Sequence, residues 1–269
     1  MSTKLKIAIA GIAGRMGRQL ASAALEAGHQ LVGASEAPGS PHLGKDVGEI
    51  LGRTGLGIEA TDDVAVAAKG ADVWIDFTRP AATLAALKAL QSAGLRAAII
   101  GTTGFDGAAE EEIAEAAGAL TIVKAGNFSL GVNLLCALTK RAAESLGEDW
   151  DIEVLETHHR RKVDAPSGTA LMLGDAAASG RGSQLKTLRA EPYDGPDAKR
   201  ETGTIGFAVR RSGGVIGEHE VTFASDMEVV SLSHTALDRA VFAHGALAAA
   251  RWAVRQPAGL YNMDDVLGL

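Results

Sequence analysis

Residues 6–17 read KIAIAGIAGRMG, and this stretch decides the fold of the chain. The apolar run 6–10 predicts a buried strand, and the glycines after it predict a tight turn that opens a helix over 14–27. This order is typical of dinucleotide-binding domains, in which a pyrophosphate lies against the backbone at the helix N-terminus. The turn residues that we expect to line such a site are Gly11, Ile12, Ala13, Gly14, Arg15 and Met16.

The spacing of these glycines is G-x-x-G-x-x-G rather than the commoner G-x-G-x-x-G, because Ile12 takes the place of the second glycine. The alternative interpretation is therefore a turn with a purely structural role, which binds no dinucleotide. Its place between a strand and a helix favours dinucleotide binding.

The first half of the chain alternates apolar runs with alanine-rich helical patterns. Such alternation predicts a Rossmann-like, doubly wound parallel sheet of the α/β class. The expected strands are 6–10, 30–35, 73–77, 97–100 and 120–124, with helices over 14–27, 80–93 and 107–118.

The second half changes character, and its strands cluster together. This predicts a second α+β domain with a mixed or antiparallel sheet. We expect helices over 131–146 and 168–178, a strand over 152–156, and strands with hairpin-like spacing over 205–210, 214–224 and 228–233. A last helix, 238–254, would return to the first domain. The domains would then be 1–128, completed by 239–269, for the dinucleotide, and 129–238 for substrate binding and oligomerisation.

The composition excludes several classes of function. The 269 residues are 46% hydrophobic and 22% charged, as in globular proteins. The net charge of −7 disfavours nucleic acids and anionic membrane surfaces as partners. A single cysteine, Cys136, excludes an intramolecular disulfide and a cysteine-based zinc site. No apolar stretch approaches the roughly 18 residues of a membrane span, and glycines interrupt the N-terminal apolar run, so we expect a cytoplasmic protein.

Glu36 follows the second expected strand, about 20 residues after the glycine turn, where an acid can bind the adenosine ribose hydroxyls. A carboxylate there repels a 2′-phosphate, and the neighbouring Ala37 offers no cation. We therefore expect NADH to be preferred, with NADPH possible as the second cofactor. An exposed acidic loop residue is the alternative interpretation of Glu36.

Loops at the carboxyl ends of later strands would complete the cofactor site, because open α/β sheets bind ligands there. Their small and hydrogen-bonding residues fit this role, although ordinary loops have the same composition. The residues concerned are Gly101, Thr102, Thr103, Ala125, Gly126, Asn127 and Phe128.

Residues 156–170 read ETHHRRKVDAPSGTA, and 158–162 are five consecutive basic or titratable residues in an acidic protein. Ser167 is a suitable helix N-cap, which would leave the N–H groups of Gly168 and Thr169 directed at an anion. The segment could bind two carboxylates and supply a proton. Zinc is disfavoured, since adjacent histidines seldom chelate one ion and no third ligand stands at metal spacing. A solvated basic loop is the alternative.

The remaining histidines have no comparable neighbours in the sequence. We interpret them as surface residues or as core residues with satisfied hydrogen bonds. They are His29, His42, His219, His234 and His244.

The run 156–170 closely resembles the signature of bacterial dihydrodipicolinate reductases. Further motifs resemble the same family in order and spacing: GIAGRMG at 11–17, DFTRP at 76–80, GTTG at 101–104, NFSLGVN at 127–133, GEH at 217–219 and GLYNMDDVL at 259–267. The resemblance implies a Rossmann-like domain completed by the C-terminal helix, a substrate domain whose sheet builds a homotetramer, and a role in lysine and diaminopimelate synthesis.

The resemblance also implies roles for single residues. His158 would be the proton donor, assisted by Lys162, and His159, Gly168 and Thr169 would hold substrate carboxylates. A hydride from the nicotinamide would add to a dicarboxylate ring, and a histidine suits the protonation that follows, because its pKa lies near the operating pH. Many relatives carry an arginine where this chain has Ala37, which argues against tight use of NADPH.

Two other functions are alternatives. One is a different two-domain dehydrogenase, for an amino acid or a semialdehyde, but the thiohemiacetal route of the latter needs a nucleophilic cysteine, and Cys136 lies in an apolar stretch. The other is a nonenzymatic nicotinamide sensor, which would not need the titratable residues 158–162.

Overall fold

The computed structural model describes residues 4–269, which form two compact units. The first unit contains the chain up to Ser129 together with Ala240–Gly268, and the second contains Leu130–Arg239. The second unit is therefore an insertion into the first.

The first unit is built on a seven-stranded sheet in which every neighbouring pair is parallel, and the α/β fold class expected from the sequence is confirmed. Its order is β11-β6-β5-β4-β1-β2-β3. Two short strands, β3 and β11, were not expected. The bounds are β1 Lys6–Ile9, β2 Gln30–Ser35, β3 Ala60–Thr61, β4 Val73–Asp76, β5 Ala97–Ile100, β6 Thr121–Lys124 and β11 Gly259–Tyr261.

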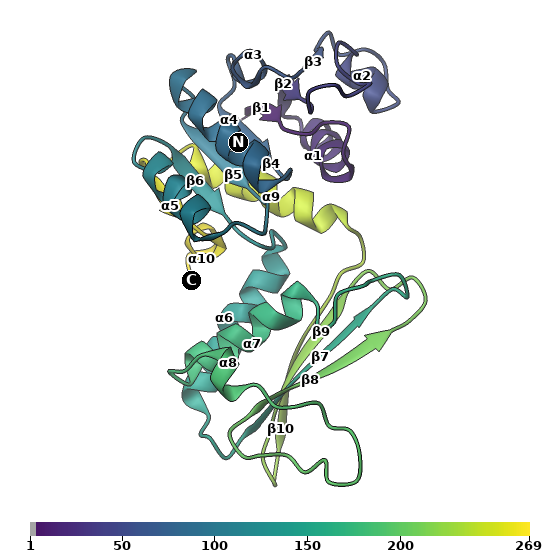
Figure 1. Ribbon diagram of the computed structural model, residues 1–269, viewed down its shortest axis with the longest axis vertical. Coiled ribbons are helices and arrows are strands. Elements are labelled where there is room, and N and C mark those ends of the chain that lie inside the picture. Colours follow the sequence, from purple (N-terminus) through teal and green to yellow (C-terminus); the bar gives the residue numbers. More distant parts are fainter. Residues whose placement is uncertain (1–3) are drawn as a thin grey trace. The chain divides into compact units, whose positions relative to one another are not determined.

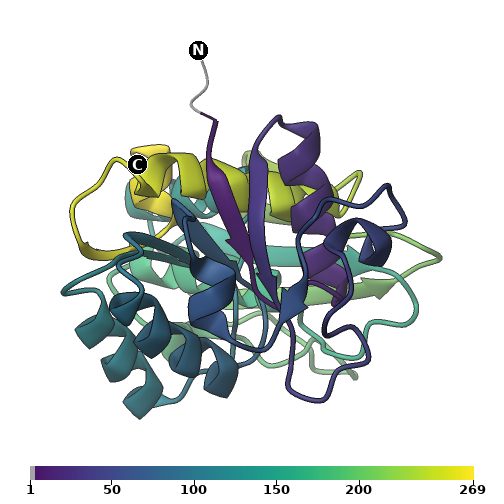
Figure 2. The same cartoon turned by 90° about the horizontal axis from the view of Figure 1, so that it is seen from above.

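Helices cover both faces of this sheet, and alternate strand residues separate the two cores. Ile7 and Ile9 pack with α1 (Arg15–Glu26) and α9 (Ala240–Ala253), and Figure 2 shows α9 running along the sheet. Ala8 between them faces the other core. That core contains residues of α3 (Val64–Ala68), α4 (Pro80–Ser92) and α5 (Gly107–Ala116). The short helices are α2 (Val47–Ile50) and α10 (Met263–Leu267).

The strand order reverses at β1. From β1 the chain passes to β2 and β3 on one side, and then returns to β4, β5 and β6 on the other. In an open parallel sheet such a reversal leaves a crevice at the carboxyl ends of the two central strands, where ligands bind. The glycine turn after β1 lies at this point.

The second unit has a four-stranded mixed sheet of order β10-β9-β7-β8. Strand β7 (Asp151–His158) pairs with β8 (Ile205–Arg211) in parallel and with β9 (Glu218–Ala224) antiparallel, and β9 forms a hairpin with β10 (Val229–Thr235). The mixed sheet confirms the expected fold class.

Two details of this sheet differ from the sequence-based expectation. The strands expected at 205–210 and 214–224 do not pair with each other, because β7 lies between β8 and β9. The second of them begins only at Glu218, since Val215 donates a turn hydrogen bond to Ser212 and Gly213 has a φ of +48°.

Helices α6 (Leu130–Ser145) and α7 (Gly168–Gly180) lie side by side on one face of this sheet (Figure 1). Inward side chains of β9, such as Val221 and Phe223, are fully buried there. The other face is not covered within the described chain, and β10 exposes residues such as Val229 and Ser231. The short helix α8 spans Leu185–Leu188. Among residues 4–269, no helix is long and apolar enough to cross a membrane.

Candidate active site

The glycine turn after β1 leaves no space for side chains where helix and strand meet. Gly11 has a φ of +62°, and its carbonyl accepts a hydrogen bond from the Gly14 N–H at 2.9 Å. A Cβ on Gly17 would lie 2.1 Å from the Gly11 oxygen, so no other residue fits there. Gly14 is the N-cap of α1, and no described side chain caps that helix. An uncapped helix N-terminus beside a glycine turn fits a pyrophosphate.

Glu36, at the end of β2, is bonded to this turn rather than free in a loop. One carboxylate oxygen accepts from the N–H of Ala13 and the other from the N–H of Ala37, both at 2.9 Å. The carboxylate therefore lies beside the turn that would bind the pyrophosphate, where a ribose would follow.

The loops after β4 and β5 are joined by a buried carboxylate. Asp76 is 1% exposed and accepts from the N–H of Thr78 at 2.9 Å and from its hydroxyl at 2.6 Å. The hydroxyl of Thr102 donates to the same carboxylate oxygen at 3.3 Å. A Cβ on Gly101 would lie 2.1 Å from the ring of Phe77, so the glycine is needed for the loops to meet.

The other residues expected at the cofactor differ in what they can offer. Ile12 and Phe128 have buried side chains that belong to the core, so only their backbone could contact a ligand. Arg15, Thr103 and Gly126 are exposed. The half-buried residues of this set are Ala13, Met16, Ala125 and Asn127.

In the second unit, the end of β7 carries a buried acid and a buried histidine. Glu156 is completely buried and His158 is 8% exposed. The Nδ1 atom of His158 lies 2.5 Å from Oε2 of Glu156. A histidine bonded through one ring nitrogen keeps the other for chemistry.

Three further hydrogen bonds hold the Glu156 carboxylate. Arg211, at the end of β8, donates to Oε2 at 2.8 Å and to Oε1 at 3.0 Å, and the N–H of Ser167 donates to Oε1 at 3.0 Å. Burial alone would raise the pKa of Glu156, but the hydrogen bonds from Arg211, His158 and Ser167 outweigh it and hold the pKa below its ordinary value. The carboxylate is therefore ionised at neutral pH.

His219, on β9, is a second buried histidine of this cluster. Its ring lies edge-on to that of His158, with centroids 5.1 Å apart, and its Nε2 is 3.2 Å from the hydroxyl of Ser167. Burial, together with the nearby His158, lowers the pKa of His219 to about 4. The interpretation of His219 as a surface or satisfied core residue was wrong, because it packs against His158 and its Nδ1 has no hydrogen-bond partner among the described residues.

The loop after β7 contains several cationic side chains. Lys162 forms an ion pair with Asp164 at 2.9 Å. Desolvation and the cations Arg239 and Arg161 lower the pKa of His159, which favours its neutral form. The segment thus keeps its positive charge on lysine and arginine, while His159 remains a hydrogen-bonding group.

Helix α7 begins next to this loop, as expected. Ser167 is its N-cap, and the serine hydroxyl accepts from the N–H of Ala170 at 3.1 Å. Gly168 and Thr169 form the first turn, and a Cβ built on Gly168 would meet nothing within 4 Å. The helix N-terminus is therefore open to a ligand on the side of Gly168.

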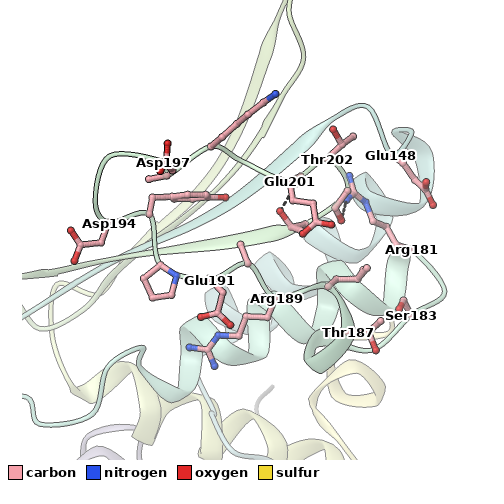
Figure 3. A pocket seen from close by; sticks show the side chains of 18 residues that line it. Glu148, Arg181, Ser183, Thr187, Arg189, Glu191, Asp194, Asp197, Glu201 and Thr202 are labelled. Atoms are coloured by element: carbon pink, nitrogen blue, oxygen red, sulfur yellow. Dashed lines mark hydrogen bonds between the residues drawn. The ribbon is translucent and has the colours of Figure 1, made fainter.

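A separate cavity of about 700 Å³ lies at the polar loop 189–204 of the second unit (Figure 3). Figure 3 shows Asp194 and Asp197 at one part of it and Arg181 at another. The Arg181 guanidinium donates to three backbone carbonyls, so its role there is structural. The lining of this cavity contains neither His158 nor its partners, and we place the candidate active site at His158.

The structure thus adds residues that sequence reasoning gave no role: Glu156, Arg211, His219 and Arg239. Within residues 4–269, no group of three histidine, cysteine, aspartate or glutamate side chains could hold a metal ion.

A doubly wound sheet with an uncapped glycine turn, joined to an inserted unit with a buried histidine–carboxylate pair, defines a two-domain dinucleotide-dependent oxidoreductase. Two family models cover almost the whole chain: "dihydrodipicolinate reductase, N-terminus" matches residues 5–128, and "dihydrodipicolinate reductase, C-terminus" matches residues 131–267. The chain belongs to the dihydrodipicolinate reductase family.

Relatives of known name agree with this assignment. The 4-hydroxy-tetrahydrodipicolinate reductase of Parvibaculum lavamentivorans is 51% identical over the full length of both chains. That of Rhodopseudomonas palustris is 49% identical over 98% of each chain.

Two solved structures share the fold. A dipicolinate-bound dihydrodipicolinate reductase from Paenisporosarcina sp. TG-14 matches with a TM-score of 0.77 at 21% identity, over 97% of this chain and 98% of that one. An amine dehydrogenase from Mycobacterium smegmatis matches with a TM-score of 0.67 at 16% identity, over 97% and 96%. These likenesses show the fold alone.

Proposed function

We propose that this chain reduces dihydrodipicolinate, formed from 4-hydroxy-tetrahydrodipicolinate by loss of water, to tetrahydrodipicolinate, a step of lysine and diaminopimelate synthesis. The observation that carries the proposal is the buried His158–Glu156 pair, which lies in the segment that most resembles the family. Family membership over both units supports the same reaction.

The first unit would hold the cofactor. Gly11 and Gly14 bring the backbone close to a pyrophosphate, and the N-terminus of α1 offers its positive end to the phosphates. Glu36 lies beside this turn and suits the ribose hydroxyls. When bound, the nicotinamide supplies the hydride.

The second unit would bind the two substrate carboxylates. Lys162 contributes a charge, and its ammonium keeps donors beyond the one used by Asp164. The first turn of α7, which contains Gly168 and Thr169, would present the helix N-terminus to one carboxylate. His159 would add a ring N–H. Binding both carboxylates would fix the ring in one orientation, which lowers the barrier to reaction.

His158 would supply the proton. Reduction of the conjugated ring leaves an electron-rich enamine, and a proton must be added to complete the product. The imidazolium form of His158 can donate that proton from Nε2, since Nδ1 is already bonded to Glu156. Lys162 would assist by stabilising negative charge as the proton moves.

The preference for NADH over NADPH rests on two residues. Glu36 would face a 2′-phosphate with like charge, and Ala37 cannot compensate for it. Arg53 forms an exposed ion pair with Glu26 at 2.8 Å and keeps further N–H donors. Together with His42 and Lys45, it is one of the residues that would permit NADPH.

The uncovered face of the second sheet supports assembly of several copies. Its strands present one covered and one open face, and an open sheet face of this kind is commonly covered by a second copy. Following the family resemblance, we propose a homotetramer in the cytoplasm, with no nucleic acid or membrane partner.

The reaction is tested by following NADH oxidation at 340 nm with substrate generated enzymatically from pyruvate and aspartate semialdehyde. We expect oxidation that depends on both the generated substrate and the chain. Controls for the other dehydrogenases follow the reduction of NAD⁺ with amino acids or with aspartate semialdehyde, which are the hydride donors of those reactions. Turnover with a control alone, or binding of NADH without any turnover, would contradict the proposal.

A further inference from the structure

The carboxylate of Glu156 has its hydrogen-bonding capacity filled by donors. Oε2 faces His158 Nδ1 at 2.5 Å and Arg211 Nη1 at 2.8 Å, while Oε1 faces Arg211 Nη2 and the Ser167 N–H, both at 3.0 Å. The side chain has no exposure to water. Burial of an acid at this depth requires that its partners be fixed.

This arrangement decides where the hydrogen of the neutral imidazole lies. An ionised carboxylate only accepts hydrogen bonds, and guanidinium and backbone N–H groups only donate. Since the Glu156 carboxylate is ionised beside Arg211, the hydrogen between it and His158 belongs to Nδ1. The lone pair of neutral His158 is therefore on Nε2, and a proton added to the ring is carried there.

The structure also places a glycine beside Nε2. A Cβ on Gly217 would lie 3.1 Å from Nε2 of His158, so the backbone of Gly217 passes beside that atom. Any side chain at this position would press on the ring edge that has to donate a proton.

We propose that Glu156, held ionised by Arg211, is the positioning carboxylate of His158. It fixes the Nδ1–H tautomer and balances the positive charge of the imidazolium, so that Nε2 is the atom that exchanges the proton with substrate. The proposal deepens the proposed function, and it rests on His158 being the proton donor. Glu156 acts through His158 and does not touch the substrate.

The first experiment needs no activity. The seven histidines are labelled with ¹⁵N in the full chain, and the His158 resonances are assigned by their loss in His158→Gln. We expect neutral wild-type His158 to be the Nδ1–H tautomer, with the hydrogen exchanging slowly. An Nε2–H tautomer, or an averaged mixture, would overturn the proposal even if the enzyme were fully active.

The second experiment compares Glu156→Gln with Glu153→Gln. Glu153 lies on the same strand and pairs with Arg200 at 2.8 Å, so it is a matched ion pair away from His158. Glu156→Gln should lose the fixed tautomer and lower kcat about tenfold to a hundredfold, with KM changed by less than about twofold. Glu153→Gln should change neither the tautomer nor kcat. Equal behaviour of the two variants would overturn the proposal.

Should Glu156→Gln fail to fold, Glu156→Gln combined with Arg211→Met removes both charges of the pair and avoids an unpaired buried arginine. The double variant should fold, bind NADH like the wild type and show the same loss of tautomer and kcat. Wild-type kcat in this variant would refute the positioning role. If the wild type had the expected tautomer but no reductase activity, the proposed function would fail while the Glu156–His158 geometry stood.

Discussion

The two units form their sites by opposite means. In the first unit, the carboxyl edge of the sheet is shaped by backbone, by glycines such as Gly17 and Gly101, and by threonine hydroxyls around the buried Asp76. In the second unit, ionisable side chains are buried against one another, with Glu156 between Arg211 and His158. A site made of backbone suits a ligand that only has to be held, whereas one made of titratable groups suits proton transfer.

This difference also determines what a substitution does. Backbone sites tolerate changes to nearby side chains and respond to added volume. Charged clusters respond to the loss of a single atom, because a buried partner is left unpaired.

The contrast is tested most strongly by His158→Gln. The variant removes the proton donor but keeps a side chain that can bond to Glu156. We expect kcat to fall by about two to four powers of ten, while the dissociation constant for NADH, measured by fluorescence, stays unchanged. Wild-type turnover by this variant would show that His158 is not the proton donor. The contrast between a site that holds a ligand and a site that transfers a proton would then fail.

The pH dependence of stability should also belong to the second unit. His219 has a pKa of about 4 in the folded chain against an ordinary value of 6.5, so below pH 6.5 the unfolded chain binds a proton that the folded chain does not. The loss of folding stability due to His219 is absent above pH 6.5, increases as the pH falls, and reaches its full size near pH 4. At about 1.4 kcal/mol per pH unit, it reaches at most about 3.5 kcal/mol.

We therefore expect His219→Gln to lose less stability than the wild type between pH 6.5 and 4, as measured by urea unfolding. His244→Gln is the matched control, because His244 is exposed on α9 of the first unit. Parallel stability curves for the wild type and His219→Gln would show that the buried imidazole does not resist protonation.

Lys162→Ala should weaken both binding and turnover of the substrate. A hydrogen bond to a charged group contributes about 1.5–3 kcal/mol, so kcat/KM should fall by about ten- to a hundredfold, with KM raised and kcat lowered. Asp164→Asn removes the ion pair but keeps the charge of Lys162, so this variant should retain most of the wild-type kcat/KM. If both variants lost only thermal stability, Lys162 would be a structural residue of the loop.

The smallest effect is expected in the first unit. Ala37→Arg adds a cation beside Glu36 and should raise kcat/KM for NADPH by about tenfold, with that for NADH changed by less than about twofold. The wild type should prefer NADH by about ten- to a hundredfold. Equal kcat/KM values for the two cofactors in the wild type would mean that another cation, such as His42 or Lys45, already binds the 2′-phosphate.

The first sheet could be predicted from the sequence because its central strands are buried on both faces and appear as apolar runs. The strands β3 and β11 could not, since a pairing of two or three residues leaves no pattern. β11 depends on its parallel partner, with Gly259 opposite Thr121. Only the tertiary fold brings these two segments together.

The second sheet shows why spacing alone misleads. Residues 212–217 connect β8 to β9, and a six-residue loop reaches about 20 Å. Two strands with one other strand between them lie only about 10 Å apart. The spacing therefore fits a hairpin and a connection across an intervening strand equally well, and β7 occupies that position.

The candidate site was predicted as far as it is local in sequence. Residues 156–170 contain the histidine, the lysine and the capped helix start, and the structure has the same helix start. Arg211 is 55 residues away from Glu156, and no local pattern links them. His219 could have been found, because alternation along β9 places it on the same face as the buried Val221 and Phe223.

The insertion of Leu130–Arg239 into the first unit has a consequence for biosynthesis. Translation proceeds at about 5–20 residues per second, so synthesis of the inserted segment takes roughly 5 to 20 s. During this interval the nascent chain has β6 but neither α9 nor β11, and one edge of its sheet stays open. The continuous inserted unit is then the first that can finish folding, and the older part of the chain is completed last.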